Sequence, residues 1–456
     1  MMNIENRRER PLPVLALACI ARPTFAVDYA GDMARQALAA LQQESWPVYG
    51  DATLLMDAQS ARQYALGLKE RAPDVLVLLC ATFSDASMAV ELASHIDAPV
   101  CLWALREPGS PGERLWLNSL CGAHLAAYAL HKAGRVVRYI YGDPGEAGLF
   151  APLRALARAA ATRKRLRTSR LGLVGEAPTG FYSCQFDELE LARVIGTTVS
   201  RIDLAQVFKA ASQAPASAVA EVIASTQRRS PSLQALRSEE VQRFGAAYVA
   251  LRALLEEQHL DGLAVRCWPE FPQDFGLMPC ATLGRLADDG FVCACEADLH
   301  GAVTLLMLQW LSGAAPLLAD VVALNEQRGA LWLWHCGNAP ACLARPGEEI
   351  PLTLHCNRRI GVAGDFAIRP GPATLARLGV GAGGYRLLYV EGELLDEPVN
   401  RFAGNTAVFR PTCHARQVLD TLIAGGWEHH VAFVAGHQAE ALEALAELLA
   451  IERVAL

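Results

Sequence analysis

The feature that most constrains this chain is an alternation of short apolar runs with stretches of amphipathic helix pattern. Residues 14–20, 75–80 and 100–104 are apolar runs of strand length. Residues 28–41 and 86–95 place apolar side chains at the three-to-four spacing of a helix. Strands that alternate with helices pair in parallel, because a parallel neighbour is reached through a crossover helix. The pattern predicts a doubly wound α/β layer.

A second alternation begins after a basic, Ala-rich stretch at residues 152–170. Strands are expected at residues 171–174, 199–203, 262–267 and 291–295, with a long helix at 238–259 and an apolar helix at 302–311. Beyond about residue 318 the apolar runs are short and separated by Gly and Pro, which predicts a β-rich third domain. No aromatic residues interleave with the basic stretch, so a solvated helix end is favoured there over a nucleic-acid patch.

Composition excludes several classes of protein. Of the 456 residues, 52% are hydrophobic and 20% charged, so the chain can bury large cores. The net charge of −7 argues against a general binder of nucleic-acid phosphates. No apolar run approaches the roughly 18–20 residues that span a bilayer. We therefore expect a soluble globular protein without nucleic-acid or membrane partners.

The cysteines and the N-terminus bear on the compartment. Thirteen cysteines are scattered singly through apolar segments, which indicates core thiols in a reducing compartment and hence a cytoplasmic protein. Arg7, Arg8 and Arg10 precede the apolar residues 13–21, a pattern that imitates a signal peptide. A first buried strand is favoured, because Arg22-Pro23 closes the run and a helical pattern follows at once.

Acidic residues just past the ends of predicted strands are the candidate chemistry. Such positions form the edge at which α/β sheets bind ligands. Glu270 follows Trp268-Pro269, a setting that can raise a carboxyl pKa, although a surface turn is the alternative. Glu296 and Asp298 close one strand and open the next helix, so Asp298 either caps that helix or contributes to a site.

Histidines follow or open other predicted strands. His335 ends one apolar run, and His429-His430 precede another. Two carboxylates with one or two imidazoles suit a divalent metal of the Mn²⁺ kind. A zinc site built from Cys293, Cys295, Cys336 and Cys342 is a weaker alternative, because their spacing lacks paired CxxC motifs.

Six short segments, in this order, resemble the L-fucose isomerase / L-arabinose isomerase superfamily, particularly its shorter fucose-isomerase-like members. They are residues 21–25, 118–122, 267–270, 295–302, 335–340 and 428–430. The resemblance implies an aldose–ketose isomerase that uses Mn²⁺, with Co²⁺ or Mg²⁺ as alternatives, and a cis-enediol intermediate. The substrate would be a fucose- or arabinose-type sugar or a related anionic one.

The resemblance also assigns roles to residues. Glu270 and Asp298 would be the catalytic acids and, with His430, the metal ligands. The implied substrate contacts are Arg22, Asn118, Glu296, His335 and His429. Glu296 is the alternative to Asp298 as the second metal acid.

The implied fold is α/β, with two Rossmann-like doubly wound domains at residues 1–168 and 169–290. A β-rich, barrel-like domain would follow at 291–456. The implied assembly is a homo-oligomer, a trimer or hexamer, with sites at subunit interfaces. Two other functions stay open: a non-catalytic sugar-binding or sensor protein on the same scaffold, and another enediol reaction such as epimerisation.

Overall fold

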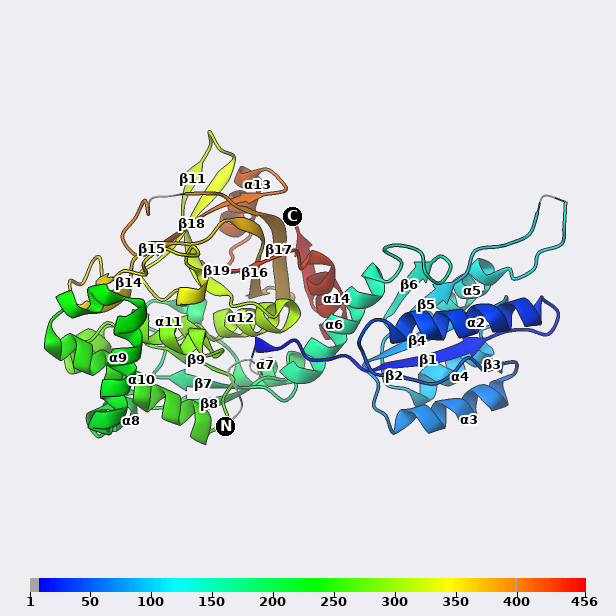
Figure 1. Ribbon diagram of the computed structural model, residues 1–456, viewed down its shortest axis with the longest axis horizontal. Coiled ribbons are helices and arrows are strands. Elements are labelled where there is room, and N and C mark those ends of the chain that lie inside the picture. The colour runs from blue at the N-terminus through cyan, green and yellow to red at the C-terminus, as the bar shows by residue number, and fades with distance from the viewer. Residues whose placement is uncertain (1–7, 111, 398–399) are drawn as a thin grey trace. The chain divides into compact units, whose positions relative to one another are not determined.

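The computed structural model describes residues 8–110, 112–397 and 400–456 (Figure 1). The described chain separates into two compact units, each of which is treated by itself below. We call residues 11–165 and 440–449 the N-terminal unit, and the remaining described residues, mainly 166–439, the large unit. The three-domain boundaries expected from the sequence stay a prediction.

A wholly parallel sheet forms the centre of the N-terminal unit. Its strands follow the order β2-β1-β4-β5-β6, with β3 beside β1. Their bounds are β1 Leu15–Ile20, β2 Val48–Tyr49, β3 Leu54–Leu55, β4 Val75–Cys80, β5 Val100–Ala104 and β6 Val137–Tyr141. The helices of this unit are α2 Val27–Gln42, α3 Ala58–Lys69, α4 Ser87–His95, α5 Ser119–Lys132, α6 Ala151–Leu166 and α14 Ala439–Leu449.

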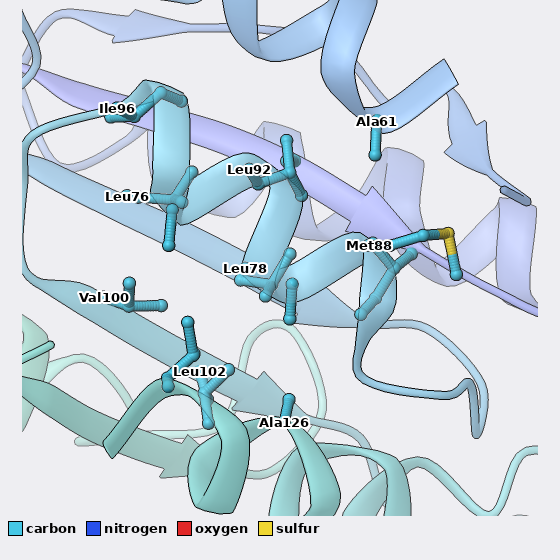
Figure 2. Packing of buried hydrophobic residues seen from close by; sticks show 14 of the residues in the cluster. Ala61, Leu76, Leu78, Met88, Leu92, Ile96, Val100, Leu102 and Ala126 are labelled. Carbon is cyan, nitrogen blue, oxygen red and sulfur yellow. The ribbon is translucent and has the colours of Figure 1, made fainter. Parts of the chain in front are cut away.

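Burial on both faces explains why the central strands are continuous apolar runs rather than alternating ones. Every residue of β1, β4 and β5 is buried. Figure 2 shows the side chains on one face of β4 and β5, among them Leu76, Leu78 and Leu102, packing with Met88 and Leu92 of helix α4. Helices α3, α4 and α5 all contribute to this cluster.

The large unit contains a second parallel sheet, in the order β10-β9-β7-β8. Its strands are β7 Arg170–Val174, β8 Thr198–Ile202, β9 Gly262–Val265 and β10 Val292–Cys295. Its helices are α7 Glu188–Val194, α8 Leu204–Ser212, α9 Ala216–Arg229, α10 Ser238–Glu257, α11 Cys280–Asp288 and α12 Leu299–Ser312.

The rest of the large unit is built around a closed barrel. Six antiparallel strands pair in the ring β18-β12-β11-β19-β16-β17, and β17 pairs back onto β18. They are β11 Leu317–Asn325, β12 Ala330–His335, β16 Gly371–Gly381, β17 Gly384–Leu394, β18 Asn405–Pro411 and β19 His430–Ala435. The smaller elements are β13 Leu352–Leu354, β14 Gly361–Gly364, β15 Phe366–Ala367, α13 Ala415–Ala424 and β20 Glu452–Ala455.

Helix α12 joins the second sheet to the barrel. It contacts β9 and β10 of the sheet and β16 and β19 of the barrel, and all its residues are buried (Figure 1). A helix covered on every side carries no polar face. This explains the mostly apolar character that predicted a helix at residues 302–311, where the polar side chains of Thr304 and Gln309 each donate a hydrogen bond to a backbone carbonyl.

The predicted fold class is confirmed: two parallel α/β sheets and a C-terminal barrel. Strands 75–80 and 100–104 have the predicted bounds, and residues 15–20 form a central strand as expected. Arg7 of the signal-peptide alternative lies outside the described residues, whereas Arg10 donates a 2.8 Å hydrogen bond to the carbonyl oxygen of Ser312. In the described part of the chain no helix has both the length and the apolar character that crossing a bilayer requires.

Candidate active site

A cavity of about 380 Å³ opens in the large unit, where the end of β10 meets the barrel strands β11, β12 and β19. This volume falls in the range of small-molecule sites. Its lining mixes carboxylates, imidazoles, a guanidinium, thiols and indoles: Cys267, Trp268, Met278, Cys295, Glu296, Asp320, Trp334, His335, Cys336, His355, Asn357, Arg358 and His430. Polar groups of this variety fit a hydroxylated, charged ligand.

Glu296 enters the cavity from a tight turn after β10. Glu296 and Ala297 both have left-handed backbone, with φ of 59° and 55°. Such strain in residues other than glycine marks turns that the surrounding structure enforces. The Glu296 carboxylate accepts hydrogen bonds from Trp268 Nε1 at 3.1 Å and from His429 Nε2 at 3.0 Å. Burial opposes ionisation, yet the contacts with His429 and His430 lower the pKa of Glu296.

Asp298 begins helix α12 and belongs to a fully buried ion network. Its Oδ1 accepts the Gly301 N–H at 2.8 Å, so it does cap the helix. Both oxygens also accept from the Arg377 guanidinium, at 2.6 and 3.0 Å, and Oδ2 lies 2.9 Å from His430 Nδ1. Burial would raise the pKa of Asp298, but Arg377 and His430 hold it well below the ordinary value. Asp298 therefore caps the helix and contacts His430 at the same time.

The Asp298 contact orients the His430 ring. Because Asp298 is ionised, His430 Nδ1 carries the proton and donates it, which leaves a lone pair on Nε2. His430 Nε2 lies 3.7 Å from Glu296 Oε2 and 3.8 Å from Asp320 Oδ1. Asp320 and His430 are directly opposed residues of the paired strands β11 and β19. His430 Nε2 thus has a carboxylate oxygen of Glu296 and one of Asp320 within 4 Å at the cavity wall.

These residues fit a hard divalent cation. Glu296, Asp320 and His430 offer oxygen and nitrogen ligands of the kind that Mn²⁺ and Mg²⁺ accept, with positions left for water or sugar oxygens. Cys184 and His429 also lie within 4.8 Å of Glu296 and His430. Burial raises the pKa of the Cys184 thiol to about 12, and both His429 nitrogens are engaged, with Glu296 and Ser183. These two residues are therefore weaker ligands.

Glu270 has a different neighbour. Arg266 binds it with two parallel hydrogen bonds, of 2.6 and 2.7 Å, and these lower the pKa of Glu270. Glu270 is not among the residues that line the cavity. Both carboxylate oxygens thus have a strong partner within the chain. The metal-ligand and base roles expected for Glu270 remain predictions.

The predicted substrate contacts fall in both units. Glu296, His335 and His429 gather with His430 in the large unit, where the His335 and His430 rings stack 5.9 Å apart. Arg22 and Asn118 lie in the N-terminal unit, Arg22 just after β1 and Asn118 just before α5. The Arg22 N–H donates to Thr82 Oγ1, past the end of the neighbouring β4. Their roles as substrate contacts remain predictions.

The sequence reasoning missed three polar residues of this region: Asp320, Arg358 and Arg377. Asp320 and Arg377 each interrupt an apolar strand, and a charge inside such a strand is a usable signal. Arg358 carried no local signal, because it lies in a polar loop. The zinc alternative finds no support among the described residues, where the second candidate metal group is instead Cys280, Cys336 and His355.

Known proteins resemble this chain along most of its length. A family model for the C-terminal domain of L-fucose isomerase matches residues 333–455. A sulfoquinovose isomerase of Priestia aryabhattai is 30% identical over 436 residues, which is 95% of this chain and 97% of that protein. Another, of Alkalicoccus urumqiensis, is 35% identical and covers 79% of this chain and 81% of its own length. A third, of Clostridium sp. (strain MSTE9), is 31% identical, with coverage of 83% and 86%.

Proposed function

This chain belongs to the fucose isomerase-like family together with the sulfoquinovose isomerases, and it is therefore a sugar aldose–ketose isomerase. We propose that its substrate is a sulfonated hexose. We further propose that the reaction needs a divalent cation and passes through a cis-enediol. The observation that carries the proposal is the convergence of Glu296, Asp320 and His430 Nε2 on one cavity wall.

In this proposal Glu296, Asp320 and His430 hold the cation. When bound, a divalent cation would supply Lewis-acid polarisation of the sugar carbonyl. Asp298 holds His430 in the tautomer that leaves Nε2 free, and Arg377 keeps Asp298 ionised. Asp298 thus acts through His430 rather than on the sugar.

Proton transfer falls to a carboxylate that faces the cavity. An aldose becomes a ketose when a base removes the C2 proton and the same group returns it to C1, while the proton of the C2 hydroxyl passes to the carbonyl oxygen on C1. We assign this to Asp320, which lines the cavity and is only partly buried. Glu296 already accepts two hydrogen bonds, and Glu270 is held by Arg266. A carboxylate that gives one oxygen to the cation keeps the other, so Asp320 can hold the cation with one oxygen and exchange the proton with the second.

The anionic group of the substrate would meet Arg358. This exposed guanidinium lines the cavity and lies 5.2 Å from the centre of the Trp268 ring. Guanidinium groups bind anions of several oxygens through parallel hydrogen bonds. Sulfoquinovose, the sugar in the names of the relatives, is a hexose that bears a sulfonate.

The test is ketose formation from sulfoquinovose and from neutral aldoses, in EDTA and with Mn²⁺ restored. We expect turnover of the sulfonated sugar only with the metal. Asp320→Asn should lower kcat by about 10²–10⁴-fold, the usual contribution of a positioned general base. Glu270→Gln, its matched comparison, should keep most activity. If Glu270→Gln is inactive and Asp320→Asn is active, the base is Glu270 instead.

Anion selectivity has its own comparison. Arg358→Met should lower kcat/KM for sulfoquinovose far more than for any neutral aldose, since it removes a contact only the sulfonate makes. Arg359→Met removes an adjacent exposed arginine that does not line the cavity, so kcat/KM should stay unchanged for both sulfoquinovose and the neutral aldoses. Equal losses for charged and neutral sugars would refute the assignment of Arg358.

A further inference from the structure

A cluster of thiols and imidazoles lies at the wall of the same cavity as the carboxylates. Cys336 lines the cavity and is partly exposed, whereas Cys280 is fully buried and does not line it. Their Sγ atoms are 3.5 Å apart. A disulfide needs about 2 Å between sulfurs, so a modest side-chain movement would join them. One thiol faces the ligand space, and a second lies behind it.

His335 is placed as a base for Cys336. Its Nδ1 lies 3.3 Å from Cys336 Sγ and accepts the backbone N–H of Cys336 at 2.8 Å. The lone pair on Nδ1 that accepts the backbone proton also lies within reach of the thiol, so Nδ1 can take the thiol proton when it gives up the backbone hydrogen bond. A thiol within hydrogen-bonding reach of an imidazole is the arrangement that generates nucleophilic thiolates.

His355 contributes a hydrogen bond rather than a metal-binding lone pair. Its Nδ1 accepts the backbone N–H groups of Asn357 and Arg358, each at 3.2 Å. In a neutral ring the proton is therefore on Nε2, and interaction with His355 helps to lower the pKa of Cys336. A metal ligand would need the opposite tautomer. This geometry favours a stabilised thiolate over a soft-metal site at Cys280, Cys336 and His355.

The two thiols differ in acidity in the direction that this arrangement requires. The hydrogen bond from Cys280 and the charge of His335 hold the pKa of Cys336 well below its ordinary value, against the effect of burial. The same hydrogen bond, together with burial, raises the pKa of Cys280. Burial also raises the pKa of the isolated core thiols Cys80 and Cys101, to about 12. Because Cys336 also lines the cavity and contacts His335, it is the thiol that meets a peroxide first, and the fully buried Cys280 lies behind it.

We propose that Cys336 is a site of reversible oxidation by hydroperoxides and that Cys280 is its resolving thiol. The Cys336 thiolate attacks a peroxide oxygen, the O–O bond breaks, and with one proton the products are a sulfenic acid and water or an alcohol. The Cys280 sulfur then attacks the sulfenic sulfur, and hydroxide leaves with the Cys280 proton as water. The peroxide is reduced, two thiols are oxidised to one disulfide, and a dithiol reverses the change.

This inference goes beyond the isomerase function but predicts a link to it. Cys336 and His335 share the cavity with the residues proposed to bind the sugar, so the disulfide would draw the Cys336 side chain away from His335. We expect the oxidised protein to lose activity and a dithiol to restore it. Sugar in the cavity should slow the oxidation, because it covers Cys336.

Mass spectrometry of the full-length protein tests the proposal independently of activity. After treatment with hydrogen peroxide and alkylation of the remaining thiols, digestion should yield one peptide pair joined through Cys280 and Cys336. Cys280→Ser should instead accumulate a sulfenic acid at Cys336 that dimedone traps, and Cys336→Ser should form neither product. Cys413→Ser removes a partly exposed thiol without an imidazole acceptor and should leave the joined pair unchanged.

Two results would overturn the proposal. In the first, Cys336 of the peroxide-treated wild-type protein reacts no faster than Cys413, and no peptide pair joined through Cys280 and Cys336 forms. The other is stoichiometric zinc in the purified protein that thiol reagents release, which would make the cluster a metal site. Loss of activity without the joined pair would likewise place the oxidation elsewhere. The wild-type measurement decides the question even if a cysteine variant fails to fold.

Discussion

Two carboxylates that are two residues apart have different surroundings in this protein. Glu296 is partly open to the cavity and is held by Trp268 and His429. Asp298 is fully buried and gives both oxygens to Arg377 and His430. A carboxylate's role depends on its environment rather than on its type. The geometry therefore supports Glu296 as the carboxylate that meets a cation and Asp298 as the group that positions His430.

Asp298→Asn tests this positioning role. An amide does not stabilise the Nδ1–H tautomer of His430 as a carboxylate does, so Mn²⁺ affinity should fall about 10–100-fold. Calorimetric titration of the metal measures the change without activity. Asp274→Asn alters an exposed carboxylate of the same unit and serves as the control. Wild-type metal affinity in a folded Asp298→Asn protein would show that the contact has no such role.

The same buried pair predicts how stability depends on pH. The folded pKa of Asp298 is depressed, so its contribution is fully present above the unfolded pKa of about 4 and is lost as the pH falls toward the folded value. The difference in unfolding free energy between wild type and Asp298→Asn should shrink by about 1.4 kcal/mol per pH unit below pH ~4. Urea titrations of both proteins from pH 7 to pH 3 measure this difference in unfolding free energy. A difference that stays constant would contradict the depressed pKa.

At the scale of elements, the barrel closes where β17 crosses onto β18. A Cβ at Gly392 would lie 2.2 Å from the carbonyl oxygen of Arg410, a backbone atom of the neighbouring strand that cannot move aside cheaply. Only a residue without a side chain allows these strands to pair here. Closure completes the ring whose opposite side is formed by β11 and β19, the paired strands that carry Asp320 and His430.

Gly392→Ala should therefore destabilise the large unit by about 1–3 kcal/mol, the usual cost of overpacking. Gly383→Ala is the matched control, because a Cβ there meets nothing within 4 Å and the backbone is not left-handed. Denaturant unfolding followed by tryptophan fluorescence compares the two, since barrel strand β12 carries Trp332 and Trp334. Equal stability of both variants would show that the strand crossing relaxes without cost.

At the scale of the whole chain, the proposed ligands come from distant segments. Glu296 follows β10, Asp320 lies in β11 and His430 opens β19. A cation that binds all three stabilises only the folded chain, because the unfolded chain does not hold them together. If the proposed cation binds, metal binding and folding are therefore coupled.

Mn²⁺ should raise the thermal midpoint of unfolding in a saturable way. At a free concentration of 100 times Kd the stabilisation is about 2.7 kcal/mol. Scanning calorimetry with increasing Mn²⁺ measures the shift. Glu296→Gln and Asp320→Asn should abolish it, whereas Glu270→Gln should retain it. If only Glu270→Gln loses the shift, Glu270 is the ligand, as the family resemblance implied.

The sequence by itself determined the elements. Buried parallel strands such as residues 75–80 appear as unbroken apolar runs, and helix α12 as an apolar helix, because burial acts on each residue locally. Sequence patterns also singled out Glu296, His335 and His430, which line one cavity, and His429, which hydrogen-bonds to Glu296; their roles stay predictions. Only the tertiary structure paired Asp320 with His430 across two strands, and Asp298 with Arg377, 79 residues away. Such partners leave no local signal, because strand register and barrel closure decide which side chains meet.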